Sequence, residues 1–270
     1  MANIKPTSFV LDHAPWSASK ADTANQCPYK FNLQYKQKKK MNVPPSKEAL
    51  IGTAVHTALE YALGGKQTVA RCFKMAIVEH RLTTTEIEDV KAFQPIAENF
   101  LRKFKNYCVR HNTSKPILEE QLGVDIYGNS LGFWDKKVLM RGVIDVSLIF
   151  SGKPHALILD HKTGKDHALK YFTNQFNTYS LLIKARTPEL EEVKLGINFM
   201  KADRVEFKNE MQDVRDIQIL MDKVISFLND STTDASENPN LVRSGPLCDW
   251  CQFISICPAH ADGANEKQKR

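Results

Sequence analysis

Apolar residues follow two periods along this chain, one typical of helices and one typical of strands. Apolar positions recur at helical spacing in stretches that we expect to be helices: 17–36, 52–65, 68–109, 168–185 and 210–228. Alternating or β-branched apolar runs lie between turn-forming residues in stretches that we expect to be strands: 117–134, 143–149, 156–160, 193–200 and 204–207. The pattern predicts a helical N-terminal part, followed by a strand-rich part that contains one long helix between strands.

Three boundary features refine this outline. A capping box of Thr85 and Glu88 is expected to open the second half of the helical stretch 68–109. Residues 1–16 contain prolines and little periodicity, so we expect them to be irregular. Residues 229–246 are polar and turn-rich, which predicts a surface linker after the last helix.

Residues 143–160 predict a β-hairpin that carries two acidic side chains. A Ser-Gly-Lys-Pro turn separates its two apolar runs. Asp145 interrupts the first run, and Asp160 closes the second, followed by His161 and Lys162. Because side chains alternate along a strand, Asp160 and Lys162 share a face while His161 points away.

These charges have two explanations. For an isolated Asp-x-Lys, charges at a strand end facing water are the commoner case. Asp145, however, lies inside an apolar strand, where an unpaired charge is costly. Two converging carboxylates suit a hard divalent cation such as Mg²⁺, and a lysine beside it can orient an attacking water and steady a phosphate. The hairpin therefore favours phosphodiester hydrolysis.

Composition agrees with a nucleic-acid partner without requiring one. The 270 residues contain 37 Lys and Arg against 31 Asp and Glu, a net charge of +6. This length can bury one substantial core, alone or with a small appended module. No stretch has the apolar length of a membrane span or the core of a signal peptide. We therefore expect a soluble, intracellular, cytoplasmic protein without membrane partners.

Four of the six cysteines form a pattern of metal-binding type. Near the C-terminus the spacing is C-x2-C-x5-C, which leaves a four-thiolate site one ligand short, and a remote cysteine before a proline would supply it. The four are Cys27, Cys248, Cys251 and Cys257. Zinc and [4Fe-4S] both accept four thiolates, so the spacing does not choose between them. Cys72 and Cys108 lack ligand-like neighbours and are expected in the core.

Two predicted helices carry polar pairs four residues apart. His56 and Glu60 lie on one side of the first, and Gln175 and Tyr179 lie on one face of the second. A lone helical histidine is most often packed or exposed, and a Gln and Tyr pair most often forms a polar flank. Either pair indicates a site only in combination with other motifs.

Taken together, the motifs resemble the PD-(D/E)xK nucleases of the RecB-like and AddB-like branch, which includes the CRISPR-associated RecB-like exonucleases. The resemblance rests on G-V-I-D and D-H-K-T-G in the hairpin, on G-T-A-V-H-T-A-L-E and Q-F-N-T-Y in the helices, and on C-P with C-x2-C-x5-C-P. These motifs stand in the expected order from Cys27 to Pro258. Their joint match is more specific than any single one.

The resemblance implies roles for individual residues. The catalytic residues would be Asp145, Asp160 and Lys162. The ligands of Mg²⁺ or Mn²⁺ would be His56, Asp145, Asp160 and the backbone carbonyl of His161. Gln175 and Tyr179 would contact the nucleic acid strand or the active-site backbone. Glu119 or Glu120 would lie near the metal, as an acidic residue on the first core strand does in some relatives, whereas Glu60 is expected to be a pairing or surface charge.

The resemblance also chooses between the two cysteine cofactors. It implies that Cys27, Cys248, Cys251 and Cys257 hold a [4Fe-4S] cluster and not zinc. In the related nucleases this cluster holds the protein together and takes no part in hydrolysis. Residues 17–45 and 229–262 would form the helical cluster-binding module, and residues 46–228 the helical insertion and catalytic core of a single nuclease domain, 1–270.

The implied fold is α/β, a restriction-endonuclease-like core with a central mixed sheet flanked by helices. The implied activity is metal-dependent cleavage of DNA, exonucleolytic on single strands or duplex ends. A structure-specific endonuclease, a CRISPR-type end trimmer and a non-catalytic nucleic-acid-binding protein on the same scaffold are the alternatives. Partner proteins would belong to a repair, viral or CRISPR system, among which the sequence does not choose.

Overall fold

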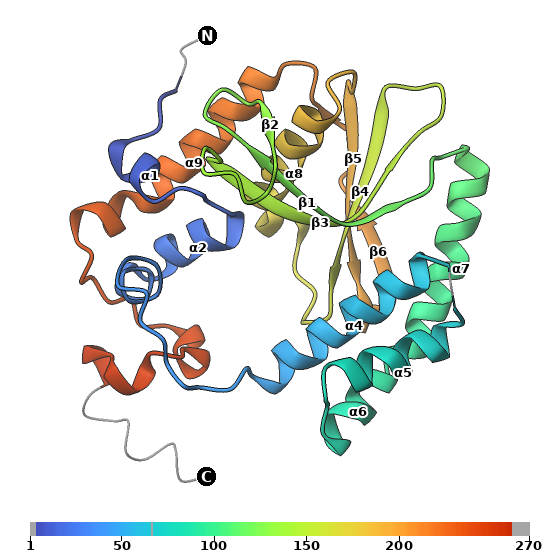
Figure 1. Ribbon diagram of the computed structural model, residues 1–270, viewed down its shortest axis with the longest axis horizontal. Coiled ribbons are helices and arrows are strands. Elements are labelled where there is room, and N and C mark those ends of the chain that lie inside the picture. Colours follow the sequence, from blue (N-terminus) through green and yellow to red (C-terminus); the bar gives the residue numbers. More distant parts are fainter. Residues whose placement is uncertain (1–3, 66, 261–270) are drawn as a thin grey trace.

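The computed structural model describes residues 4–65 and 67–260, which fold around one mixed sheet (Figure 1). Its strands are β1 (Ile117–Val124), β2 (Ser130–Leu131), β3 (Met140–Ile149), β4 (His155–Lys162), β5 (Glu192–Phe199), β6 (Arg204–Phe207) and β7 (Gln212–Asp213). The strand order is β2-β1-β3-β4-β5-β6, and β7 pairs with β5. The pair β4–β5 is parallel, and the other pairs are antiparallel. The expected α/β architecture is confirmed.

Helices cover both faces of this sheet. The longer ones are α2 (Ala18–Gln26), α4 (Lys47–Leu63), α5 (Val69–Glu79), α6 (Thr84–Lys91), α7 (Gln94–His111), α8 (Thr173–Arg186) and α9 (Ile217–Glu237). The short ones are α1 (Ser8–Asp12), α3 (Pro28–Phe31), the π-helix η1 (Asn32–Lys36) and the 3₁₀ segments η2 (Leu169–Phe172), η3 (Met200–Ala202), η4 (Pro246–Trp250), η5 (Ile254–Ile256) and η6 (Pro258–His260). These bounds reproduce most of the helices expected from the apolar spacing.

Two hydrophobic cores lie on opposite faces of the sheet. One core packs α2, α8 and α9 against strand residues such as Ile144 and Ile158, and we call it the α8-side core. The other packs α4, α5 and α7 against Val146 and Leu159, and we call it the α4-side core. Because both faces are covered, β3 and β4 are nearly continuous in apolar residues, and a polar side chain inside them is conspicuous.

The β3–β4 hairpin and the α8 crossover set the position of the polar residues. Residues Val146–Ile149 pair with Leu159–Ala156, so the predicted hairpin is confirmed. Parallel strands need a crossover connection, and α8 supplies it between β4 and β5. The chain therefore leaves β4 at Lys162, and α8 begins near that same end of the sheet before β5 starts.

The N-terminal helices α1 to α3 pack against α9 and the segment that follows it, on the left of Figure 1. Trp16 is fully buried and pairs with Met140 at the start of β3. The amide of Tyr29 donates a hydrogen bond to the Leu241 carbonyl at 3.0 Å. The Tyr29 hydroxyl donates to the Ile256 carbonyl at 3.4 Å, so the turns that carry the C-terminal cysteines lie against α3.

Three expected boundaries or positions differ in the structure. The capping box is formed by Thr83 and Glu86, because the Glu86 carboxylate accepts from the Thr83 amide at 2.7 Å. Part of residues 1–16 is ordered as α1, which is capped by the Thr7 hydroxyl. Cys108 is only half-buried at the margin of the α4-side core, whereas Cys72 is fully buried.

The last long helix begins and ends later than its apolar spacing predicts. Asp216 caps α9 through the amides of Gln218 and Ile219, because the preceding residues pair in β7. The helix continues to Glu237, so the predicted linker is helical over its first half. Its polar residues there are small, and Thr232 is buried with its hydroxyl bonded to the Leu228 carbonyl.

Within residues 4–65 and 67–260, none of the helices combines the length and apolar character that crossing a membrane requires.

Candidate active site

Three carboxylates occupy neighbouring positions across three adjacent strands. Leu118 pairs with Val146 and Glu120 with Ile144, so Glu119 on β1 lies opposite Asp145 on β3. The β3–β4 pairing ends at Val146 and Leu159, so Asp145 and Asp160 are the next residues of their strands. We call these three residues the carboxylate row. Like charges directly opposite one another destabilise a sheet, so this arrangement calls for a cation.

At the carboxylate row, the alternation of side chains changes on β3 and the backbone conformation changes on β1. Side chains two residues apart normally share a face, yet Ile144 belongs to the α8-side core and Val146 to the α4-side core. On β1, Glu119 has a φ of 47°, the left-handed region that a non-glycine residue rarely adopts. The two strands therefore change face at Asp145 and Glu119, which frees both carboxylates from the regular pleat.

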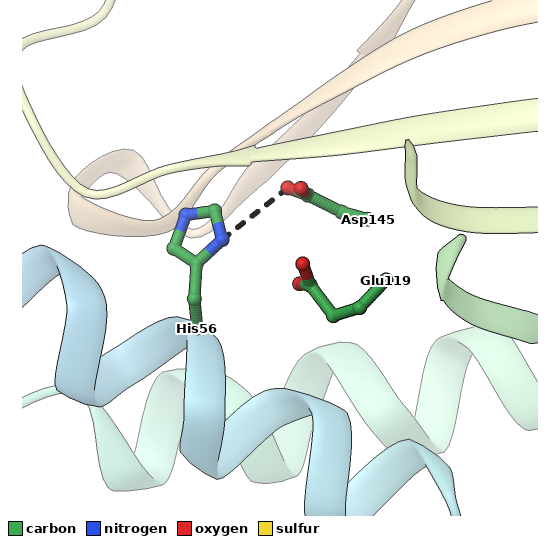
Figure 2. Close-up of side chains that lie close together, drawn as sticks. All are labelled: His56, Glu119 and Asp145. Carbon is green, nitrogen blue, oxygen red and sulfur yellow. Dashed lines mark ion pairs between the residues drawn. The ribbon is translucent and has the colours of Figure 1, made fainter. Parts of the chain in front are cut away.

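His56 faces the carboxylates from helix α4. Ser46 caps this helix by accepting from the Ala49 amide, and its buried stripe packs on the α4-side core. The imidazole Nδ1 lies 3.4 Å from Asp145 Oδ2. Figure 2 shows His56, Asp145 and Glu119 pointing toward one another from α4, β3 and β1. One ligand atom from each lies within 4.8 Å of the others, a set that could hold a metal ion.

His161 connects this set to β4 through its backbone. Its amide donates to Asp145 Oδ2 at 2.7 Å, and its backbone also hydrogen-bonds the His56 ring. Its side chain points into the α4-side core, where Asn198 lies 3.0 Å from Nδ1 and Phe100 packs edge to face. Burial lowers the pKa of this imidazole to about 3, so the ring is neutral. The side chain points away from Asp160 and Lys162, as strand alternation predicts.

Asp160 is held by three side chains and is 3% exposed. Lys162 Nζ lies 2.6 Å from Oδ2. Gln175 Nε2 donates to Oδ1 at 2.8 Å, and the Tyr179 hydroxyl donates to the same oxygen at 3.0 Å. Gln175 also donates to the Tyr179 hydroxyl at 2.8 Å. The β4 end and α8 therefore fix the Asp160 carboxylate from two sides.

The family comparison agrees with this geometry. The family model of the PD-(D/E)XK nuclease superfamily matches residues 15–258. The chain belongs to this superfamily. A solved structure titled "Crystal structure of SSO0001" is similar at 15% sequence identity and a TM-score of 0.33, over 86% of this chain and 95% of that one. No curated protein matches the chain.

As a PD-(D/E)XK superfamily member, the chain has a fold and residues that suit nuclease chemistry with a divalent metal. Its mixed sheet flanked by helices is consistent with the restriction-endonuclease-like core that the motifs predict.

The electrostatics of this candidate site indicate a deficit of positive charge around its carboxyl groups. Burial, and then the Asp160 charge, raise the pKa of Asp145 well above its usual value. Burial, followed by the charges of Glu60 and Asp160, raises the pKa of Glu119 to about 7. Burial also lowers the pKa of His56, which favours the neutral imidazole that binds metals. A bound cation would restore the ionised form of both carboxyls.

The structure chooses between the two acidic residues on β1. Glu119 faces His56 and Asp145, whereas Glu120 pairs with Arg186 at 3.2 Å and accepts from Ser147 at 3.3 Å. Glu60 lies close enough to raise the pKa of Glu119, so it contributes to the site's charge. The strand register that selects Glu119 is not visible in the sequence, because either residue fits an alternating strand.

The expected ligands do not all fall into one group. His56 and Asp145 lie together with Glu119, while Asp160 lies outside that group and is held by Lys162, Gln175 and Tyr179. Gln175 and Tyr179 contact Asp160 directly, and their role at this site is therefore first of all to orient that carboxylate.

Four cysteines of the PD-(D/E)XK nuclease line one cavity of about 190 Å³ between α3 and the C-terminal turns. They are Cys27, Cys248, Cys251 and Cys257. All four are free thiols, and the Gly245 amide points at Cys248 Sγ at 3.3 Å. The sequence pattern and the fold thus bring the same four sulfurs to one place.

Proposed function

We propose that this chain is a Mg²⁺- or Mn²⁺-dependent deoxyribonuclease that hydrolyses phosphodiester bonds at single strands or duplex ends. The supporting observation is the carboxylate row of Glu119, Asp145 and Asp160, with His56 facing one end and Lys162 paired with the other. The superfamily match supports a nuclease, and the net charge of +6 suits a polyanionic substrate.

The residues present fit a divalent cation. Glu119 and Asp145 offer the oxygen ligands that Mg²⁺ and Mn²⁺ prefer, and a neutral His56 adds a nitrogen that Mn²⁺ accepts readily. Asp160 and the His161 carbonyl complete the proposed ligand set. When bound, such an ion polarises the scissile phosphate and lowers the pKa of a coordinated water.

Lys162 acts on the substrate side of Asp160. Its ammonium forms an ion pair with Asp160, yet the side chain keeps 31% of its surface exposed, so a phosphate can reach it. There it steadies the developing negative charge and orients the attacking water. Gln175 and Tyr179 hold Asp160 in one orientation, so the lysine has a fixed partner.

Asp160→Ala and Lys162→Ala test the proposal. Each should lower the rate of DNA cleavage by about 100-fold or more, because each removes a group that acts on the phosphate. The assay uses 5′- and 3′-labelled linear DNA with Mg²⁺ or Mn²⁺. Lys153→Ala, at the exposed turn of the same hairpin, is the matched control and should keep full activity.

Closed circular DNA in the same assay separates exonucleolytic from endonucleolytic cleavage. An exonuclease releases label from linear DNA and leaves closed circles intact. Retained cleavage in both the Asp160 and Lys162 variants, or no cleavage of any DNA by the wild type, would refute the proposed function.

For the cysteine cavity we propose a structural [4Fe-4S] cluster. The four cysteines line one cavity, and four thiolates are a ligand set that such a cluster takes. The spacing C-x2-C-x5-C-P with a remote Cys-Pro, which resembles that of the iron-sulfur nucleases, favours the cluster over zinc. The cluster would join α3 to the C-terminal turns and would take no part in hydrolysis.

An anaerobic preparation tests the cluster independently of cleavage. The expected result is iron and sulfide in the protein, with broad absorption near ~400 nm. The same absorption should remain in Asp160→Ala and Lys162→Ala. Stoichiometric zinc, with neither iron nor sulfide, would contradict the assignment.

A further inference from the structure

The segment that joins Lys162 to Gln175 carries an exposed aromatic ring. Tyr171 is 71% exposed. Other strongly exposed aromatic side chains in the described part of the chain are Tyr127, Trp134 and Trp250, and none of these lies between two residues that hold Asp160. An exposed tyrosine is common by itself, so its surroundings decide what it can do.

The backbone beneath Tyr171 is fixed against the active site. The next residue, Phe172, lies with its ring 5.6 Å from Lys162 Nζ. Phe172 also packs against Phe176 and Phe199, at 6.4 and 6.1 Å between ring centroids. The Tyr171 amide donates to the Ala168 carbonyl at 3.0 Å within the η2 turn. Tyr171 is thus one residue away from the group that touches the proposed catalytic lysine.

The charges around Tyr171 suit a phosphate backbone. Lys165 and Lys170 are exposed on the same segment, and Lys170 Nζ lies 5.4 Å from the Tyr171 ring. The acidic residue of the segment, Asp166, is paired with Arg204 at 3.1 Å. A strand whose phosphate reaches Lys162 would therefore meet further positive charge beside the ring.

We propose that Tyr171 stacks on an unpaired nucleobase next to the scissile phosphate and that it gives the enzyme its preference for single-stranded or frayed DNA. This inference rests on the proposed nuclease function. Base stacking on an aromatic side chain tolerates any sequence, because every base has a flat π-face. Inside a duplex both faces of a base are already covered by its neighbours, so only an unpaired base can use Tyr171.

Binding to single-stranded DNA is measured first, with EDTA present so that no cleavage occurs. Short oligonucleotides carry the fluorescent base 2-aminopurine at one position, moved stepwise from each end. Tyr171→Ala should weaken binding by about tenfold and should abolish the quenching seen at one position with the wild type. Tyr171→Phe and Tyr171→Trp, which keep a ring, should retain both. Tyr127→Ala, which removes an equally exposed ring on a distant loop, should change neither.

A base-removal cycle tests whether the ring and the base act on each other. Replacing the quenched position by an abasic site should weaken wild-type binding about as much as Tyr171→Ala does. The same replacement should have no further effect on the Tyr171→Ala protein, because the partner of the base is already gone. Additive losses would overturn the proposal.

Cleavage assays with Mn²⁺ separate this proposal from the proposed function. Tyr171→Ala should raise KM for single-stranded DNA while leaving hydrolysis of bis-p-nitrophenyl phosphate, which has no base, unchanged. A wild type without any hydrolysis would refute the nuclease assignment. In that case the binding measurements in EDTA would still test whether Tyr171 stacks on a base. An active Tyr171→Ala with wild-type KM and affinity would defeat the stacking alone.

Discussion

At Glu119 the backbone takes a left-handed conformation that costs about 1 kcal/mol or more for a residue with a Cβ. Strain of this kind persists only where the surrounding structure imposes it. Here it turns one carboxylate out of the pleat of β1 and toward Asp145 and His56. The residue that strains the strand is the one that completes the group that could hold a metal ion.

The charge of Glu119 should make stability depend on pH when no metal is bound. Its pKa is raised from 4.5 to about 7, so the folded state holds this proton more tightly than the unfolded state. Stability is therefore lost as the pH rises from 4.5 through 7. With EDTA present, Glu119→Gln should stabilise the protein by roughly 1 to 2 kcal/mol at pH 8, a value reduced for partial exposure, and should change little at pH 5.

Urea unfolding at the two pH values measures this difference. Glu120→Gln is a control on the same strand, and it should destabilise because it breaks the pair with Arg186. Addition of Mn²⁺ should stabilise the wild type at pH 8 and should stabilise Glu119→Gln much less, since a ligand is missing. An equal gain at pH 5 and pH 8 in EDTA would exclude charge as the cause.

The hydroxyl of Tyr179 is expected to matter through Asp160. Tyr179→Phe removes one donor to Oδ1 and leaves Gln175 in place. We expect a 10- to 100-fold loss in Mn²⁺ affinity or in activity, the range found when a partner of a metal ligand is removed. Titration of cleavage rate against Mn²⁺ concentration measures it. Tyr107→Phe, a change far from the row on α7, should leave the titration curve unchanged.

Among the secondary-structure elements, the hairpin was predictable, and the last helix was predicted but its bounds were not. Apolar runs around a Ser-Gly-Lys-Pro turn specify β3 and β4, and strand alternation alone separates the face of His161 from that of Asp160 and Lys162. In α9, by contrast, the cap is decided by the pairing of β7 with β5, a contact between residues distant in the chain. Local periodicity cannot report such a contact.

The start of α9 can be tested by two substitutions. Asp216→Ala removes the side chain that accepts from the Gln218 and Ile219 amides, and should lower the free energy of unfolding by about 1 kcal/mol. This corresponds to about 2 to 4 °C in Tm for a chain of this size class. Glu210→Ala changes the residue where apolar spacing alone would begin the helix, and should have little effect. A larger loss of stability in Glu210→Ala than in Asp216→Ala would indicate that the helix begins near residue 210.

The same limits apply to the carboxylate row. The sequence contains Asp145, Asp160 and Lys162 on one hairpin, so their proximity follows from local structure. The choice of Glu119 over Glu120 needs the β1–β3 register, and the approach of His56 needs the docking of α4 on the sheet. The family motifs indicate His56 because they contain information about packing that periodicity lacks.

For the molecule as a whole, the important feature is that the joint between α2 and α3 meets the C-terminal turns around one cavity. Cys27 belongs to the joint between α2 and α3, whereas Cys248, Cys251 and Cys257 belong to the C-terminal turns, and one cavity receives all four. A cofactor held there closes almost the entire chain into a loop. Its contribution to stability would thus be global and would not be confined to the turns that hold it.

Cys27→Ser is expected to lower thermal stability without changing the rate of DNA cleavage. The variant should lose the ~400 nm absorption and unfold at a lower temperature, while cleavage measured well below that temperature remains near the wild-type rate. Cys108→Ser, at a half-buried position on α7, is the matched control and should keep the absorption. Full loss of cleavage in a folded Cys27→Ser protein would mean that the cluster takes part in the reaction.

In the crossover from β4 to β5, the exposed connection can change in sequence and length separately from the residues that hold Asp160. Lys162 ends the strand and Gln175 lies in the helix, and both are anchored to Asp160. The exposed residues 164–168 between them are bound at both ends, so insertions or deletions there would leave the sheet and the acidic centre as they are. Relatives could therefore acquire new substrate preferences by altering one surface connection, with no need to rebuild the catalytic machinery.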